Sequence, residues 1–105
     1  MIQSGRHATS SPGGFMPEYA FLVIGSEFVE SYGAQDFSFA ERQRFRRALQ
    51  LLDENEQHPS LRVHRLQGKD AGVWSLSASD ELRITFKRLP DGKKLILRCS
   101  RHYHG

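Results

Sequence analysis

The sequence predicts a small α+β domain in which two N-terminal helices pack on a twisted, mainly antiparallel sheet, in the order strand, helix, helix and then four strands. Three observations predict this class. Apolar residues recur at helical spacing in the first half, apolar and polar residues alternate in the second half, and Asp91-Gly92 is typical of hairpin turns. The 105 residues suit one domain, and we expect it to occupy residues 18–105.

Residues 1–17 are rich in Ser, Gly and Pro, so we expect a disordered lead, with Met16 as an alternative first residue. The chain has no apolar run that could span a bilayer and no apolar segment typical of a signal peptide. Its one cysteine, Cys99, cannot form an intrachain disulfide, and its five histidines lack zinc-site spacing. We therefore expect a cytoplasmic protein that has no membrane segment, metal or other cofactor.

The first two elements follow directly. Tyr19–Gly25 is a nearly continuous apolar run of strand length, which predicts a central strand. Ser26 is then a typical N-cap residue for a short helix, and Gly33 is a typical end for it.

A longer helix comes next. Ser38 and Glu41 have the spacing of a capping box, and the helix they start should run to about Glu56, before His58-Pro59 ends it. Its inward face should consist of Phe45, Ala48, Leu49 and Leu52.

Four strands should complete the chain. They are Leu61–Leu66, Trp74–Ala78, Glu81–Arg88 and Lys94–Ser100. Side chains alternate across a strand, so each strand divides its residues between two faces. The apolar set, which we expect to face the helices and to include Cys99 as a buried small hydrophobe, is Trp74, Leu76, Ala78, Leu82, Ile84, Phe86, Leu95, Leu97 and Cys99.

The opposite face then carries Ser75, Ser77, Arg83, Thr85, Lys87, Arg98, Ser100 and His102, and only Ile96 departs from the pattern. Arginines beside a histidine suit phosphate binding and proton transfer. An ordinary solvated sheet face explains the same alternation. The alternation alone therefore leaves open whether this face binds phosphate or is simply solvated.

Several motifs together resemble the RelE/ParE superfamily of bacterial toxins, nearest its YafQ-like and YoeB-like subgroups. They are HPSL after the long helix, the turn HRLQG, a strand that begins at Trp74, the strand LRITF, and the closing segment RCSRHYH. The resemblance spans residues 19–104. It implies the toxin of a type II toxin–antitoxin system, an endoribonuclease that cleaves mRNA on the ribosome and is held inactive by a cognate antitoxin.

In such toxins the 2′-OH of the RNA attacks the adjacent phosphate. The reaction needs a general base at the 2′-OH, a cation at the phosphorane and an acid at the leaving 5′-oxygen, but no metal. The resemblance leaves open which histidine is the base, with a preference for His102 as the acid. By motif, the catalytic candidates are His64, Arg83, Arg98 and His102. Glu81, Tyr103 and His104 are further candidates for catalysis or substrate positioning.

The chain departs from the family at three positions. Ser75 and Ser77 stand where RelE has lysines, and Ser60 stands where YoeB has its catalytic glutamate. A mechanism built on those groups is therefore excluded. Two other functions stay open: a ParE-like gyrase poison, against which the closing imidazoles argue, and a catalytically degenerate member that binds only an antitoxin or RNA.

The charge is distributed unevenly. Residues 1–41 carry five acidic residues and one basic residue, whereas residues 42–105 carry seven acidic and fourteen basic residues. Eleven of the fifteen basic residues are arginines, whose forked guanidinium groups match phosphates. We therefore expect an acidic antitoxin and ribosome-bound mRNA as partners. The candidate RNA or ribosome contacts are Arg42, Arg46, Arg47, Arg62, Arg65, Lys69, Lys87 and Arg101.

Overall fold

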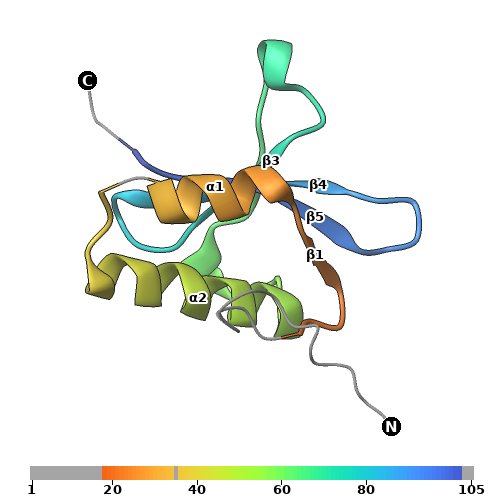
Figure 1. The fold of residues 1–105 in the computed structure, drawn as a ribbon. Helices are drawn as coiled ribbons and strands as arrows, with labels where there is room; N and C mark the ends of the chain where they lie inside the picture. Colours follow the sequence, from red (N-terminus) through yellow and green to blue (C-terminus); the bar gives the residue numbers. More distant parts are fainter. Residues whose placement is uncertain (1–17, 35, 103–105) are drawn as a thin grey trace, which may run out of the picture.

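The computed structural model describes residues 18–34 and 36–102 (Figure 1). The predicted lead and the candidates Tyr103 and His104 lie outside these residues. The α+β class and the element order are confirmed. The elements are β1 (Leu22–Ile24), α1 (Ser26–Ala34), α2 (Phe39–Glu54), β2 (His64–Arg65), β3 (Trp74–Ser77), β4 (Leu82–Arg88) and β5 (Lys94–Arg101), with 3₁₀ turns at Pro59–Leu61 and Gly68–Asp70.

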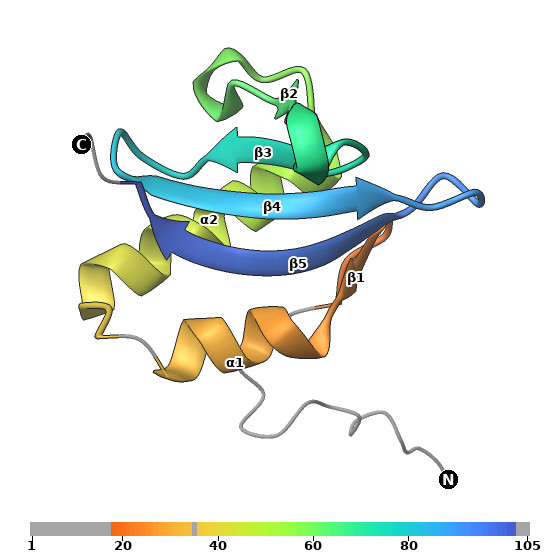
Figure 2. The same cartoon turned by 90° about the horizontal axis from the view of Figure 1, so that it is seen from above.

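The strands form one five-stranded sheet in the order β1-β5-β4-β3-β2. β1 runs parallel to β5, and all other neighbours are antiparallel. Figure 2 shows α2 crossing behind β3 and β4 while α1 lies along β5. No helix in the described part of the chain is long and apolar enough to cross a membrane.

Helix α2 forms as the sequence predicts. The Ser38 hydroxyl accepts the backbone N–H of Glu41, and the Glu41 carboxylate accepts the N–H of Ser38, which completes the capping box. The rings of Tyr32 and Phe37 pack against Phe45, so α1 and the loop after it share the core of α2. All four predicted inward residues of α2 are buried: Phe45, Ala48, Leu49 and Leu52.

The prediction of a central strand over Tyr19–Gly25 is wrong. Only Leu22–Ile24 is a strand, and β1 lies at the edge of the sheet, paired with β5 alone. The apolar run misled because its length resembles that of a buried strand, whereas at the edge Phe21 and Val23 remain 54% and 39% exposed. The Asp53 carboxylate of α2 accepts the backbone N–H groups of residues 20 and 21, so these donors are satisfied outside the sheet.

The predicted strand Leu61–Leu66 is reduced to His64–Arg65. Pro59 opens a 3₁₀ turn, and Arg62 then adopts a left-handed conformation with a φ of 49°. Neither conformation continues a strand. The turn and its Arg62 cap therefore replace the start of the predicted strand, and pairing begins only at His64.

A β-bulge in β5 changes which residues face the core. Thr85 pairs with Arg98, but the next residue of β4 pairs with Ile96, so Leu97 is an extra residue. The alternation shifts by one at this point. Ile96 is therefore buried, Leu95 and Leu97 are only half-buried, and the prediction that Leu95 and Leu97 face the helices is wrong.

Candidate nucleic-acid interface and active site

Polar residues form two rows across the sheet on the face opposite the buried apolar side chains. The first row crosses β2, β3, β4 and β5, and the second crosses β3, β4 and β5. The backbone N–H of His102 donates to the Glu81 carbonyl at 2.6 Å, which extends the β4–β5 pairing one step further. We call this set the polar sheet face: His64, Ser75, Thr85 and Arg98 in the first row, Ser77, Arg83 and Ser100 in the second, and Glu81 and His102 at its end.

Strand geometry indicates which candidates can share a substrate. Neighbouring strands lie about 4.8 Å apart, and residues two apart in one strand about 6.6 Å. The Cα atom of Arg83 is therefore roughly 8 Å from those of Arg98 and His102. His64 lies two strands away from Arg83, at roughly 12 Å. Arg83 is thus the centre of the group. Arg98 and His102 lie on the neighbouring strand on one side of it, and His64 lies on the other side.

Arg83 is held by the turn that precedes its own strand. Its Nη1 donates to the carbonyls of Ser79 at 2.8 Å, Asp80 at 3.0 Å and Leu82 at 3.1 Å. Its Nε and Nη2 make no hydrogen bond to another described residue. One side of the guanidinium is therefore anchored, and the other retains donors suited to a phosphate.

The contact of His64 with Arg62 fixes the tautomer of its ring. His64 Nδ1 lies 2.9 Å from the carbonyl oxygen of Arg62. A carbonyl can only accept, so Nδ1 of the neutral ring carries the proton and Nε2 keeps a lone pair. The exposed ring is therefore prepared to take a proton at Nε2.

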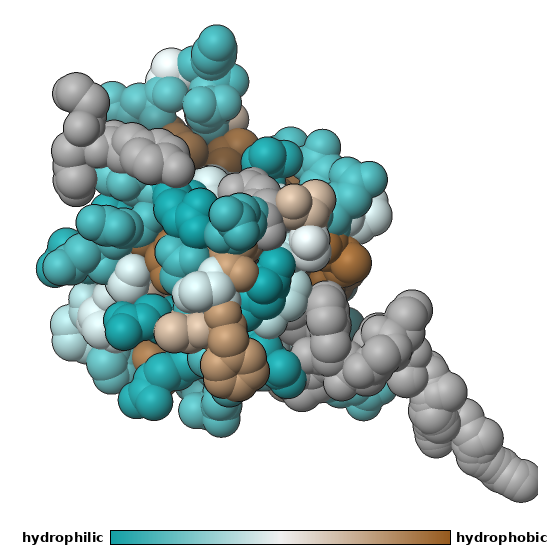
Figure 3. Space-filling view, turned by 60° about the vertical axis from the view of Figure 1, so that its left-hand side comes forward, coloured by the Kyte–Doolittle hydropathy of each residue, from teal (hydrophilic) through white to brown (hydrophobic). Residues whose placement is uncertain are grey.

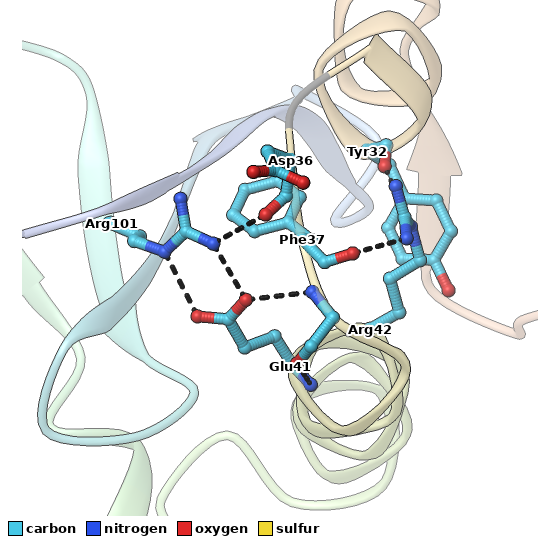
Figure 4. A network of polar contacts seen from close by, with 7 residues as sticks. Tyr32, Asp36, Phe37, Glu41, Arg42 and Arg101 are labelled. Carbon is cyan, nitrogen blue, oxygen red and sulfur yellow. Dashed lines mark hydrogen bonds and ion pairs between the residues drawn. The ribbon is translucent and has the colours of Figure 1, made fainter.

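Arg101 has partners inside the protein (Figure 4). Its guanidinium donates to the Glu41 carboxylate at 3.0 and 2.8 Å and to the Asp36 carbonyl at 2.7 Å. The bonds from Arg101, with the N–H of Ser38, lower the pKa of Glu41 to about 2. This ion pair ties the end of β5 to the start of α2, directly before His102.

Other basic candidates also have internal contacts. Arg42 donates to the carbonyls of Tyr32 and Phe37. The Arg65 guanidinium lies 5.9 Å from the centre of the Trp74 ring, a cation–π distance. Of the remaining RNA-contact candidates, Arg46 is half-buried and the exposed ones are Arg47, Arg62, Lys69 and Lys87.

Cys99 is buried as predicted. The hydroxyl of Ser31 accepts the backbone N–H of Cys99 at 3.1 Å and lies 3.5 Å from its sulfur. Burial raises the pKa of the thiol, so it stays protonated and packs against α1.

Sequence reasoning did not select Arg44, His58 and Ser60 as site residues. The structure places all three in one groove, together with Arg47 and Arg62. The spacing of Arg44 and Arg47 on α2, three residues apart, was the available signal. Hydrophilic side chains cover most of the molecular face seen in Figure 3.

Comparison with known proteins identifies the fold. No family model matches the sequence, and no curated protein does. Solved structures do match. A YoeB/ParE toxin from Agrobacterium tumefaciens is 20% identical with a TM-score of 0.58, over 80% of this chain and 100% of that one. YoeB from Staphylococcus aureus is 18% identical with a TM-score of 0.61, over 82% and 100%.

A third similar structure is the E. coli DinJ–YafQ toxin–antitoxin complex. It is 16% identical with a TM-score of 0.62, over 77% of this chain and 90% of that one. These likenesses confirm the predicted architecture at sequence identities too low to carry activity with them. The chain therefore has the fold of the YoeB and YafQ toxins.

Proposed function

We propose that this protein is the toxin of a type II toxin–antitoxin system and a ribosome-dependent endoribonuclease that cleaves mRNA without a metal. One observation carries the proposal. His64, Arg83, Arg98 and His102, which lie far apart in the sequence, share one face of the sheet with Arg83 at its centre. The RelE-like fold supports the same assignment.

The chemistry assigns a role to each group. Arg83 and Arg98 hold the scissile phosphate and stabilise the negative charge of the phosphorane. His64 takes the proton of the 2′-OH at Nε2, the 2′-oxygen forms its bond to phosphorus, and the P–O5′ bond breaks. His102 gives a proton to the leaving 5′-oxygen. The products are a 2′,3′-cyclic phosphate and a 5′-OH.

A cognate antitoxin is the expected protein partner. The similar DinJ–YafQ structure is a toxin–antitoxin complex. The excess of basic residues after residue 41 of this chain favours a partner with an acidic, extended segment. Such a segment laid on the polar sheet face would exclude RNA by occupying the same arginines.

The test is translation of a reporter mRNA in a purified bacterial system, with primer extension to detect cuts. We expect discrete cuts that require ribosomes, absent when the same mRNA is incubated with the protein alone. Full-length mRNA together with unimpaired translation would contradict the proposal.

A catalytically degenerate RNA- or antitoxin-binding member is the second candidate, and one observation favours it. Ser75 and Ser77 are buried on the polar sheet face at positions between His64 and Arg83, where they supply no charge. Such a protein would bind RNA and leave it intact. The ParE-like alternative predicts instead that the protein inhibits supercoiling by purified DNA gyrase.

A further inference from the structure

A second basic site adjoins the polar sheet face. A groove of about 490 Å³ lies between α2 and the turn of residues 58–62. Its lining includes Ser77 at the end of β3, beyond the two residues of β3 that pair with β2. Because Ser77 also pairs with Arg83, the groove and the second row of the polar sheet face meet at this residue.

Three arginines give the groove its charge. Arg44 and Arg47 reach it from α2, and Arg62 reaches it from the turn. Asp80 is the acidic residue in its lining. None of the three guanidinium groups makes a hydrogen bond or ion pair to another residue of the described chain. They are therefore available to an anion, and their forks suit phosphate oxygens.

His58 adds a neutral donor to the same groove. The backbone N–H of Ser60 donates to His58 Nδ1 at 3.2 Å, so the neutral imidazole carries its proton on Nε2 and can donate there. The Ser60 hydroxyl lies 2.8 Å from the same Nδ1. The hydroxyl therefore donates to Nδ1 and holds the ring, and Nε2–H is left to donate. A polar side-chain donor beside arginines is typical of contacts to a nucleic-acid backbone.

The backbone of Arg62 is a further, independent sign of function. Arg62 has a φ of 49°, and no other non-glycine residue of the described chain has a positive φ. A left-handed conformation is unfavourable for a residue with a Cβ atom, and such residues concentrate at functional sites. Arg62 is part of the groove lining.

We propose that this groove binds a phosphodiester of single-stranded RNA, next to the phosphate held by Arg83. The inference rests on the proposed function only in taking the polar sheet face as the place where RNA is cut. An RNA chain that enters through the groove would pass Ser77 and reach Arg83. The groove would therefore fix the direction and register of the strand.

The experiment measures binding, so that its result does not depend on cleavage. The probe is a fluorescent single-stranded hexanucleotide with 2′-O-methyl groups, which block the attacking oxygen. Fluorescence anisotropy gives its affinity for the wild type, for Arg44→Gln/Arg62→Gln and for the control Lys93→Gln, whose charge lies in the β4–β5 hairpin. Melting curves confirm that each variant folds.

We expect the double variant to bind roughly 10-fold or more weakly, because charge-assisted hydrogen bonds are lost. The slope of log K against log salt should fall by about 0.7 for each phosphate contact removed. Lys93→Gln should bind like the wild type. The 2′-O-methyl dinucleotide has a single phosphate, which can bind at Arg83 without contacting the groove. Its affinities for the wild type and the double variant should therefore be equal.

Equal hexanucleotide affinities for the wild type and the double variant would overturn the inference. So would a Glu-rich decapeptide that binds the wild type and not the double variant while RNA affinity is unchanged, since this would assign the groove to a protein. RNA binding that depends on the groove, without cleavage on ribosomes, would refute the proposed function and leave the groove assignment intact.

Discussion

His64 and Arg98 lie at the two ends of a single row of cross-strand pairs that runs through Ser75 and Thr85. Thirty-four positions apart in the sequence, they are joined only by the register of the sheet. Two local irregularities set this register: the 58–62 turn before His64 and the bulge at Leu97, one residue before Arg98. The proposed site thus depends on details of sheet geometry.

The two histidines should differ in their importance. The Cα atom of His102 is roughly 8 Å from that of Arg83, against roughly 12 Å for His64. We expect His102→Gln to lower the single-turnover cleavage rate about 10²-fold or more, since general acid–base catalysis contributes at least this much. His64→Gln should have an equal or smaller effect. A larger loss in His64→Gln than in His102→Gln would contradict the central place of Arg83.

Arg83 should contribute to stability as well as to cleavage. Its Nη1 bonds to two carbonyls of the β3–β4 turn and to that of Leu82, the first residue of β4, so Arg83→Ala should lower the free energy of unfolding by about 1 kcal/mol. Arg83→Lys keeps one charged donor and should recover part of this stability but little of the activity, because an ammonium lacks the guanidinium fork. Urea denaturation of the wild type and both variants measures the effect. Unchanged stability in Arg83→Ala would show that the turn does not need these bonds.

The Glu41–Arg101 pair should make stability depend on pH in the acidic range. The pKa of Glu41 falls from its ordinary 4.5 to about 2 in the folded protein. A lowered carboxyl pKa stabilises the fold above the ordinary pKa, and this contribution is lost as the pH falls from about 4.5 toward 2. The melting-temperature difference between the wild type and Glu41→Gln should therefore be largest near neutral pH and shrink below pH 4.5.

A double-variant cycle with Arg101→Gln isolates this pair from the other contacts of Arg101. The coupling between the two residues should disappear near pH 2, where the carboxylate becomes protonated. A coupling that is constant from pH 7 to pH 2 would contradict the ion pair.

Two glycines make a matched test of the packing between β1, α1 and β5. A Cβ atom on Gly25 would lie 2.6 Å from the carbonyl oxygen of Ile96, whereas one on Gly33 would have no neighbour within 4 Å. We expect Gly25→Ala to cost about 2 kcal/mol of stability. Gly33→Ala, inside α1, should add about 0.5 kcal/mol, because alanine favours a helix more than glycine does. Equal changes in melting temperature for Gly25→Ala and Gly33→Ala would contradict the close packing of Gly25 against β5.

Arg62→Gly should stabilise the protein and weaken its RNA binding. Glycine adopts the left-handed conformation without a Cβ penalty, which is worth about 1 kcal/mol and roughly 4 °C or more in melting temperature. The hexanucleotide affinity should fall at the same time, because the guanidinium is lost. Higher stability with unchanged RNA affinity would show that the Arg62 guanidinium does not contact the RNA.

The sequence predicted the elements whose signals are local. The capping box, the inward face of α2 and the β4–β5 hairpin are all confirmed, because each depends on residues within about two turns or one hairpin. The strand Leu61–Leu66 was overpredicted, since periodicity cannot reveal that Arg62 adopts a left-handed conformation.

The remaining errors have long-range causes. The order of the strands decides whether Leu22–Ile24 lies at the edge or the centre of the sheet. The composition of a single strand does not reveal that order. The bulge at Leu97 exchanges the two faces of β5 for the residues that precede it. In the sequence, the only sign of the bulge was that Ile96 broke the alternation of apolar and polar residues. Arg98 and His102 kept their predicted face because they lie on the other side of the bulge from the mispredicted Leu95.

The most direct test of the account is the chemistry of the cut ends in ribosome-bound mRNA. Cleavage reactions with the wild type, Arg83→Ala and the control Lys93→Gln would be mapped by primer extension, and the fragment ends analysed. We expect cuts with the wild type and Lys93→Gln that leave a 2′,3′-cyclic phosphate and a 5′-OH, and none with folded Arg83→Ala. Full cleavage by Arg83→Ala, or fragments that carry a 5′-phosphate, would show that the polar sheet face does not perform the reaction described.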